Sequence, residues 1–212
     1  MKISLNDAGK RFNRDWIFRH FSYSFETGNA YAITGPNGSG KSTLLQALSG
    51  SMLLSEGSIE YRISNLPTGQ AGKEQKIEEI YQQVSICAPY LEVVEEMTLR
   101  EFLDFHHGFK PFLPGITTDS IIATLGLEKA ANKQIRYYSS GMKQRVKLAQ
   151  CIFSDTAIVL LDEPCTNLDT AGIELYHSLI NSYCKDRLVI VSSNDEVEYG
   201  FCKEKISMAD YK

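Results

Sequence analysis

The sequence predicts an α/β fold with parallel strands at its centre. Short runs typical of strands recur along the chain, and helical patterns separate them. Two runs, Ala157–Leu161 and Leu188–Val191, are apolar throughout, as expected for parallel strands covered on both faces. The segment between them, Ala171–Tyr183, has the length and pattern of a helix. Together the three segments predict a βαβ unit.

The elements before this unit follow from local patterns. His20–Gly28 alternates aromatic and polar residues, as a half-buried strand does, and Ala30–Thr34 is a short apolar strand that enters a glycine-rich turn. A helix over Lys41–Leu48 follows that turn directly, and Gly57–Ile63 alternates as another strand. Proline and glycine in Leu66–Gly72 predict a surface loop.

A long helical stretch occupies the middle of the chain, from Thr98 to Gln150. Thr98 is suited to cap its first helix, because Glu101 stands three residues later as in a capping box. Gly126 and Gly141 divide the stretch into shorter helices. We interpret it as a helical insertion between the strands.

Length and composition set limits on the class of protein. The 212 residues suit one domain, and 43% apolar with 23% charged residues is ordinary for a folded globular chain. Because the net charge is −4, we expect no direct binding of nucleic acid. No apolar run approaches the roughly 20 residues of a membrane helix, and the first residues, MKISLNDAGKRF, lack a signal-peptide core. We therefore expect a cytoplasmic protein with no membrane segment.

Cysteine usage agrees with that compartment. The chain has 5 cysteines, an odd number, and no CxxC pair for metal or redox chemistry. We expect all of them to be reduced thiols, some in the core. They are Cys87, Cys151, Cys165, Cys184 and Cys202.

A phosphate-binding loop lies between the strand Ala30–Thr34 and the helix Lys41–Leu48. It matches the pattern GxxxxGK[ST] and reads Gly35-Pro36-Asn37-Gly38-Ser39-Gly40-Lys41-Ser42-Thr43. Its glycines let backbone N–H groups surround a phosphate chain, and the helix adds a partial positive charge at its N-terminus. Lys41 is expected to bridge β- and γ-phosphate oxygens, and the Ser42 hydroxyl to bind Mg²⁺. The loop therefore predicts binding of a nucleotide.

Two carboxylates, Asp162 and Glu163, follow the apolar strand Ala157–Leu161. Asp162 is placed to hold Mg²⁺ through water, and Glu163 to polarise a water that attacks the γ-phosphate. The alternative to these roles is an ordinary acidic loop after a core strand. The phosphate loop upstream favours the catalytic roles over this alternative.

The segment Tyr138-Ser139-Ser140-Gly141-Met142-Lys143-Gln144-Arg145 resembles the signature motif of the ATP-binding cassette (ABC) family, usually LSGGQ. The resemblance covers essentially the whole chain, because the phosphate loop, helical insertion, signature, Asp-Glu strand and an Asn-Leu-Asp loop at 167–169 come in family order. It implies a P-loop NTPase core with a mixed sheet, an N-terminal antiparallel β sub-domain and a helical sub-domain over residues 90–150. Taken alone, the segment would instead indicate an ordinary helix cap.

The resemblance also implies how ATP is bound. Ser139 and Gly141 match the family positions that reach the γ-phosphate of a partner subunit, so a single cassette implies a homodimer closed on two MgATP. Phe12 resembles the aromatic residue that stacks on adenine. A core role for Phe12 is the alternative, and Trp16 competes for the stacking role.

Two positions depart from the family pattern. Tyr90 stands where a glutamine usually touches Mg²⁺, and Gln82 and Gln83 lie too early to replace it. Asn194 stands where the family has a histidine after the last core strand, and an amide cannot carry a proton or a charge. We therefore expect intact ATP binding and dimerisation with modest hydrolysis.

The resulting hypothesis is an ATPase subunit, peripheral on the inner membrane face, that drives separate transmembrane subunits, with export favoured by similarity to small exporter cassettes. The resemblance places the membrane-subunit contact at Tyr90–Phe105, where core packing is the alternative for most apolar residues. These are Leu91, Val93, Val94, Met97 and Leu99. A soluble cassette acting on ribosomes or DNA is the second hypothesis, although such relatives generally carry two cassettes or a coiled coil. A small-molecule kinase is the third, and it has no use for the signature.

Overall fold

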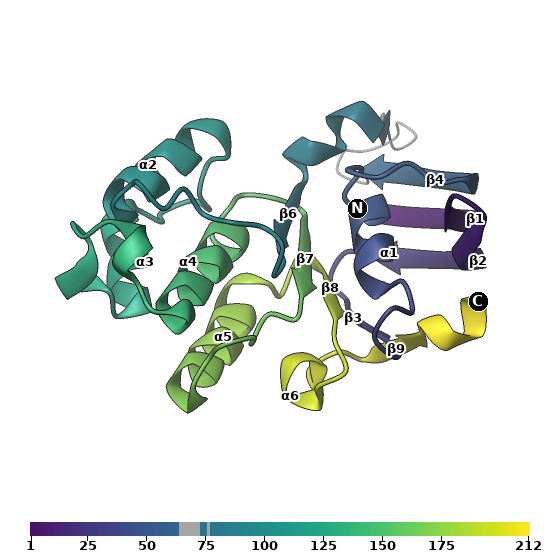
Figure 1. The fold of residues 1–212 in the computed structure, drawn as a ribbon. Coiled ribbons are helices and arrows are strands. Elements are labelled where there is room, and N and C mark those ends of the chain that lie inside the picture. The colour runs from purple at the N-terminus through teal and green to yellow at the C-terminus, as the bar shows by residue number, and fades with distance from the viewer. Residues whose placement is uncertain (64–72, 76) are drawn as a thin grey trace.

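Two sheets form the framework of the molecule, and helices cover them (Figure 1). The computed structural model describes residues 1–63, 73–75 and 77–212. The predicted loop Leu66–Gly72 lies outside the described residues. The strands are β1 (Lys2–Phe12), β2 (Asp15–Glu26), β3 (Ala30–Thr34), β4 (Glu56–Ile63), β5 (Lys73–Gln75), β6 (Val84–Cys87), β7 (Ile158–Asp162), β8 (Leu188–Ser192) and β9 (Glu204–Ser207). The α-helices are α1 (Lys41–Leu48), α2 (Leu99–Phe109), α3 (Thr118–Leu125), α4 (Ser140–Ile152), α5 (Thr170–Tyr183) and α6 (Glu196–Tyr199).

The first sheet is antiparallel, with strand order β2-β1-β4-β5. Its strand β2 begins at Asp15, five residues before the predicted start at His20. Sequence patterns did not indicate β1, because a shift of register between Leu5 and Ala8 interrupts its alternation. Asp7 lies inside this irregularity with a φ of 48°, so the strand is bulged there.

The second sheet has strand order β6-β7-β8-β3-β9, and all neighbouring strands run parallel. Both of its faces are buried. Ile158 and Leu160 of β7 belong to the core between the two sheets, which also contains α1. Val159 and Leu161 of the same strand belong to the core on the helical side. The parallel strands predicted from the two apolar runs are therefore confirmed as β7 and β8. They are apolar throughout because both faces of the sheet are covered.

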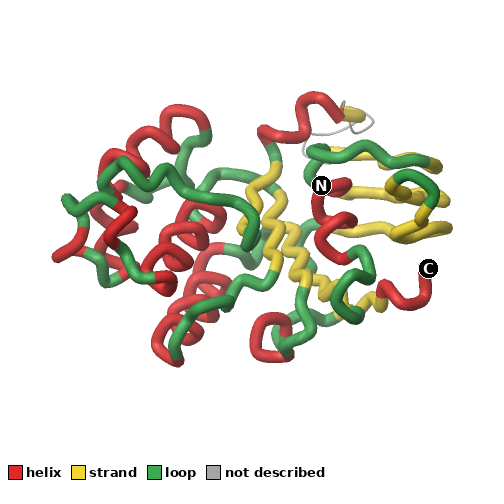
Figure 2. The backbone as a smooth tube through the Cα atoms, viewed as in Figure 1, coloured by secondary structure: helices red, strands yellow, loops and turns green. Residues whose placement is uncertain are grey.

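Helices α2, α3, α4 and α5 lie on the side of the parallel sheet away from the antiparallel sheet, whereas α1 lies between the two sheets (Figure 2, helices in red). Thr98 caps α2 as predicted, and its side chain and that of Glu101 form a complete capping box. Gly126 ends α3 with a left-handed backbone, φ 67°. Within the described residues, no helix combines the length and apolar character needed to cross a bilayer. All five cysteines are free thiols, and Cys87, Cys151 and Cys184 are buried.

A buried arginine joins the helical side to the sheet. Arg187, just before β8, is 7% exposed, and it donates hydrogen bonds to the carbonyl oxygens of Ile152 (2.6 Å), Thr156 (2.7 Å) and Ser154 (3.0 Å). These carbonyls belong to the end of α4 and the turn that leads into β7. Burial lowers the pKa of Arg187, yet its donors are matched by acceptors, so the guanidinium fixes where α4 ends.

Arg187→Met is expected to lower the free energy of unfolding by about 2–4 kcal/mol, because three buried carbonyl groups lose their donors. Urea denaturation measures the change. Arg62→Met is the control, since Arg62 is exposed and its contact with Glu60 lies at the surface; a change below about 0.5 kcal/mol is expected there. Equal effects of the two substitutions would show that the Arg187 contacts add no stability.

Candidate functional site

The candidate site lies at one edge of the parallel sheet, where β3, β7 and β8 end together. Ser192, the last residue of β8, is paired with Ile33 of β3 on one side and with Asp162 of β7 on the other. Because parallel strands place their carboxyl ends at the same edge, the loops that follow these strands meet there. Those loops contain most of the predicted site residues.

The phosphate loop follows β3 and leads into α1 as predicted. Gly35, Gly38 and Gly40 have φ angles of 140°, 76° and 99°, which side chains rarely allow. Lys41, only 6% exposed, turns back over the loop, and its Nζ donates to the carbonyl oxygen of Gly35 at 2.7 Å. The Ser39 hydroxyl is buried and has no hydrogen-bond partner among the described residues. The backbone N–H groups of the loop, the Lys41 ammonium and the Ser39 hydroxyl are therefore hydrogen-bond donors suited to an anion.

The two carboxylates after β7 differ in environment. Asp162 is 2% exposed, and its Oδ1 accepts a hydrogen bond from Ser192 Oγ at 2.7 Å. Glu163 is exposed and has a φ of 44°, in the left-handed region, while its N–H donates to the carbonyl oxygen of Ser192 at 2.9 Å. The strand end is therefore rigid at Asp162, and the chain turns sharply at Glu163.

A cavity of about 360 Å³ brings Glu163 to the phosphate loop. Its lining contains Lys41 and Ser42, so predicted residues from two distant segments of the chain share one space. It also contains Ile17 of β2, which the sequence analysis did not single out. The other lining residues are Asn37, Gly38, Gly40 and Thr43.

Asn194 contacts the phosphate loop directly. Its side-chain Oδ1 accepts a hydrogen bond from the N–H of Gly35 at 3.1 Å. Tyr90 is half-exposed near Asp162; burial raises the pKa of Tyr90, Asp162 adds to the increase, and a hydrogen bond with Gln46 opposes it. Both departures from the family pattern are thus close to the phosphate loop and the carboxylates.

The signature segment lies at a second cavity, of about 690 Å³. Ser139 caps α4, where its Oγ accepts from the N–H of Met142 at 3.3 Å, and Gly141 follows in the first turn. A Cβ at Gly141 would lie 3.0 Å from the carbonyl oxygen of Asn167, so the close approach favours glycine. Asn167 and Asp169 also line this cavity. It shares no lining residue with the cavity at the phosphate loop, so one chain does not bring the two motifs together.

The loop that ends at Asp169 is held in place by polar contacts. Asp169 caps α5 by accepting from the N–H of Gly172 at 2.8 Å, and it forms an ion pair with Arg145 at 3.2 Å. The hydrogen bond from Gly172 is the main cause that lowers the pKa of Asp169, and Arg145 contributes. Asn167 has a φ of 65° in the same loop.

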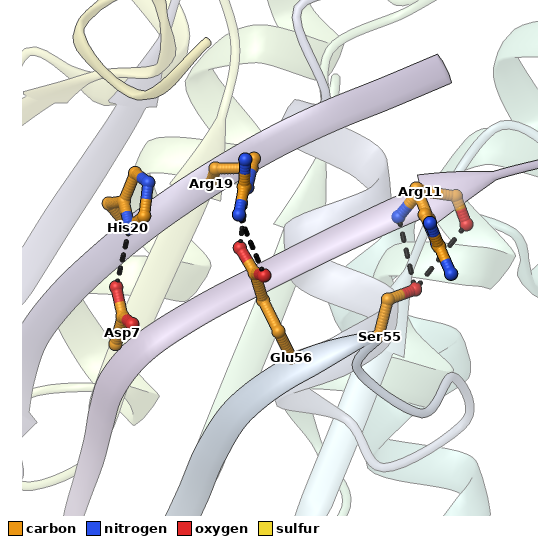
Figure 3. Close-up of polar contacts among 6 residues, drawn as sticks. All are labelled: Asp7, Arg11, Arg19, His20, Ser55 and Glu56. Atoms are coloured by element: carbon orange, nitrogen blue, oxygen red, sulfur yellow. Dashed lines mark hydrogen bonds and ion pairs between the residues drawn. The ribbon is translucent and has the colours of Figure 1, made fainter. Parts of the chain in front are cut away.

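The two aromatic candidates differ in their surroundings. Phe12 is 48% exposed at the β1–β2 turn, with the Lys10 ammonium 5.3 Å from the ring centre, and it does not line the phosphate-loop cavity. The Trp16 ring lies 4.2 Å from the guanidinium of Arg19 and 5.5 Å from that of Arg11. Glu56 holds Arg19 with two hydrogen bonds, of 2.7 and 3.0 Å (Figure 3). Cation–π contacts therefore already engage Trp16.

The phosphate-loop cavity fits a magnesium nucleotide. Above Gly38 no described atom lies within 4 Å of where a Cβ would be, so the glycine-rich turn is open toward solvent. Lys41 and Ser42 line the cavity, and Asp162 lies outside its lining at the end of β7. A hydroxyl and a carboxylate are oxygen ligands of the kind that Mg²⁺ prefers. The donor set thus suits phosphate oxygens and one divalent cation.

The fold and this site define a P-loop nucleotide-binding protein. The family described as ABC transporter matches residues 18–166, and the chain belongs to this family. The chain is 30% identical to an uncharacterized ABC transporter ATP-binding protein, YybJ, of Bacillus subtilis, over 97% of this chain and 92% of the relative. It is 29% identical to the cytochrome c biogenesis ATP-binding export protein CcmA of Rhizobium meliloti, over 97% and 96%.

Solved structures agree on the fold. A putative ABC transporter ATP-binding protein of Pyrococcus furiosus has a TM-score of 0.79 at 21% identity, with all of both chains covered. A dimeric bacterial ABC transporter cassette has a TM-score of 0.77 at 21% identity, over 97% of this chain and 94% of that chain. The predicted fold, with its antiparallel and helical parts, is confirmed. The core sheet was expected to be mixed, but in the described residues its strands all run parallel, and the antiparallel strands form a sheet of their own.

Gly40→Ala is expected to lower the free energy of unfolding by more than about 1 kcal/mol and to weaken ATP binding, because φ is 99° and the new Cβ would lie 2.7 Å from Ile17 Cγ2. Thermal unfolding and titration with a fluorescent ATP analogue measure the two effects. Gly108→Ala in α2 is the control, with no described atom within 4 Å and an expected gain of about 0.4–1 kcal/mol. ATP affinity unchanged in Gly40→Ala would contradict the loop geometry.

Proposed function

We propose that the chain is the ATP-hydrolysing subunit of a membrane transporter, in which two copies close on two MgATP and drive separate transmembrane subunits. One observation carries the dimer: the phosphate-loop cavity and the signature cavity share no residue. This separation supports an arrangement in which Ser139 and Gly141 contact a nucleotide at Lys41 from a second copy of the chain. The dimeric form of a similar cassette supports this arrangement.

Each residue has a distinct part in the proposed reaction. Lys41 and the loop N–H groups bind the phosphate chain, and Ser42 with Asp162 would hold Mg²⁺, which neutralises phosphate charge when bound. Glu163 accepts a proton from the attacking water, since it faces the same cavity as Lys41. Phe12 offers an exposed ring for adenine, whereas the Trp16 ring is already in contact with two arginines.

Hydrolysis is proposed to be slow. The Tyr90 phenol, with a raised pKa, is a poor substitute for an amide oxygen beside Mg²⁺. The Asn194 amide accepts from Gly35 and cannot take up a proton during the reaction. Both substitutions affect chemistry rather than binding, because Lys41 and the glycines of the loop are intact.

The membrane-subunit contact is proposed on the helical sub-domain, residues 90–150. Leu91 and Val94 are 37% and 40% exposed in the predicted segment, whereas Val93 and Leu99 are buried and belong to the core. Phe105 and Phe109 extend the exposed apolar surface along α2, with ring centres 4.9 Å apart. The name of the relative CcmA, an ATP-binding export protein, supports transport in the export direction. The name of the relative SrtF, a lantibiotic transport ATP-binding protein, supports a role in transport. We propose that the chain acts at the cytoplasmic face of a membrane.

Glu163→Gln is expected to reduce ATP turnover at least about 100-fold, because the amide cannot accept the proton, while ATP binding is retained. Light scattering with ATP and magnesium should then show a stable dimer. Glu174→Gln, an exposed change on α5, is the control and should turn over ATP like the wild type. Full turnover in Glu163→Gln would exclude Glu163 as the base.

The same variant identifies the partner. Purification of the Glu163→Gln chain from a detergent extract with ATP is expected to recover polytopic membrane proteins. Recovery of ribosomes or DNA instead would overturn the transporter assignment in favour of a soluble cassette.

Tyr90→Gln combined with Asn194→His is expected to raise kcat by at least about tenfold, since it restores an amide beside the metal and an ionisable group after β8. Steady-state ATPase assays at several ATP concentrations measure kcat and KM, and the single substitutions serve as controls. If the wild type already turns over as fast as the double variant, the two departures do not slow hydrolysis.

A further inference from the structure

One peptide group in the loop after Glu163 is held at both ends by side chains. The carbonyl oxygen of Pro164 accepts a hydrogen bond from Gln144 Nε2 at 2.7 Å. The N–H of Cys165, which belongs to the same peptide group, donates to Glu198 Oε1 at 2.6 Å. Gln144 and Glu198 are 4% and 5% exposed, so water does not compete for these bonds. We call this arrangement the Pro164–Cys165 clamp.

The two side chains of the clamp come from different parts of the site. Gln144 lies on α4, five residues after Ser139 in the signature segment. Glu198 lies on α6, four residues after Asn194. The backbone of Glu198 is itself fixed, because its carbonyl oxygen accepts from the buried Tyr176 hydroxyl at 2.7 Å. The clamp thus connects the signature helix with the loop that contacts Gly35.

The clamped peptide immediately follows a strained residue. Glu163 has a φ of 44°, a conformation that non-glycine residues adopt only when their surroundings impose it. Its own N–H is fixed by Ser192 at the end of β8. The peptide on the other side of Pro164 is fixed by Gln144 and Glu198, so the chain is held on both sides of the turn.

We propose that Gln144 and Glu198 are positioning residues, which hold the Pro164–Cys165 peptide and thereby keep Glu163 turned toward the phosphate loop. The proposal rests on the proposed function, because it assigns the clamp a role in ATP hydrolysis. Neither side chain lines the phosphate-loop cavity, so each acts through the backbone next to Glu163. The clamp also holds the loop toward Asn167, which lines the signature cavity.

The clamp requires a hydrogen-bond acceptor at position 198 and not a negative charge. Burial raises the pKa of Glu198, and the charges of Asp195 and Glu163 add to the increase, while hydrogen bonds from Ser193 and Cys165 oppose it. A glutamine has nearly the same shape and keeps the accepting oxygen. Glu198→Gln therefore preserves the clamp, whereas Glu198→Leu fills the space and removes the acceptor.

Amide hydrogen exchange on the full chain without nucleotide tests whether the clamp exists. Glu198→Leu is expected to speed exchange of the Cys165 N–H by about tenfold, and Glu198→Gln to leave it near the wild-type rate. Glu196→Leu is the control, because Glu196 lies on the same short helix with an exposed side chain. Unchanged exchange in Glu198→Leu would overturn the clamp.

ATPase kinetics test what the clamp does. Glu198→Leu is expected to lower kcat by about ten- to a hundredfold with little change in KM, because Glu163 is displaced while the phosphate loop is intact. Glu198→Gln should restore most of kcat. Gln144→Asn, which withdraws the donor by one methylene, should also lower kcat, and it tests the same peptide group if Glu198→Leu fails to fold. In the double variant, Gln144→Asn should lower kcat by a smaller factor than it does in the wild-type chain, because both substitutions act on the same peptide group.

The possible failures are distinguishable. A Glu198→Gln variant as slow as Glu198→Leu, or equal losses in binding and turnover, would overturn the positioning role. A wild-type chain without ATPase activity, combined with fast Cys165 exchange in Glu198→Leu, would overturn the proposed function while the clamp stands.

Discussion

The site depends on the position of β8 between β7 and β3. Ser192 is paired with Asp162 and Ile33, and it also makes a side-chain hydrogen bond to Asp162 and a backbone bond to Glu163. A shift of one residue in either pairing would turn every side chain of that strand to the opposite face. Because alternate residues of β7 belong to two different cores, such a shift would disrupt both. The packing of the sheet therefore fixes how the carboxylates lie relative to the phosphate loop.

Sequence patterns predict the parts of this arrangement that are local. The phosphate loop and the Asp162–Glu163 pair are contiguous motifs, and each directly follows an apolar strand. The strands and the helix next to these motifs can therefore be predicted from the sequence alone. The bulged β1 was not predicted, because Asp7 and its neighbours break the alternation on which strand prediction depends. The strand β9 was missed for another reason: Glu204–Ser207 is short and mostly polar, and only pairing with β3 makes it a strand.

The residues that sequence reasoning missed at the site act through tertiary contacts. Ile17 reaches the phosphate-loop cavity only because β2 lies against Gly40. Gln144 and Glu198 meet the same peptide group from segments more than fifty positions apart in the sequence. A buried glutamine or glutamate in a helix carries no local signal of the backbone group it will bond. The requirement that buried polar groups find partners could have flagged them, although it could not have named the partner.

Strain and support are combined at the turn after β7. A left-handed glutamate costs free energy, and the fold offsets that cost with fixed hydrogen bonds on both sides of the residue. The supporting groups come from two segments that face different nucleotides in the proposed dimer: α4, which presents the signature to the nucleotide of the other copy, and α6, which follows Asn194 beside the chain's own phosphate loop. A displacement of either helix would therefore act on Glu163 through one peptide group. Since interfaces and packed cores shift between discrete arrangements rather than deforming continuously, this turn is where closure of two copies would change the alignment of Glu163.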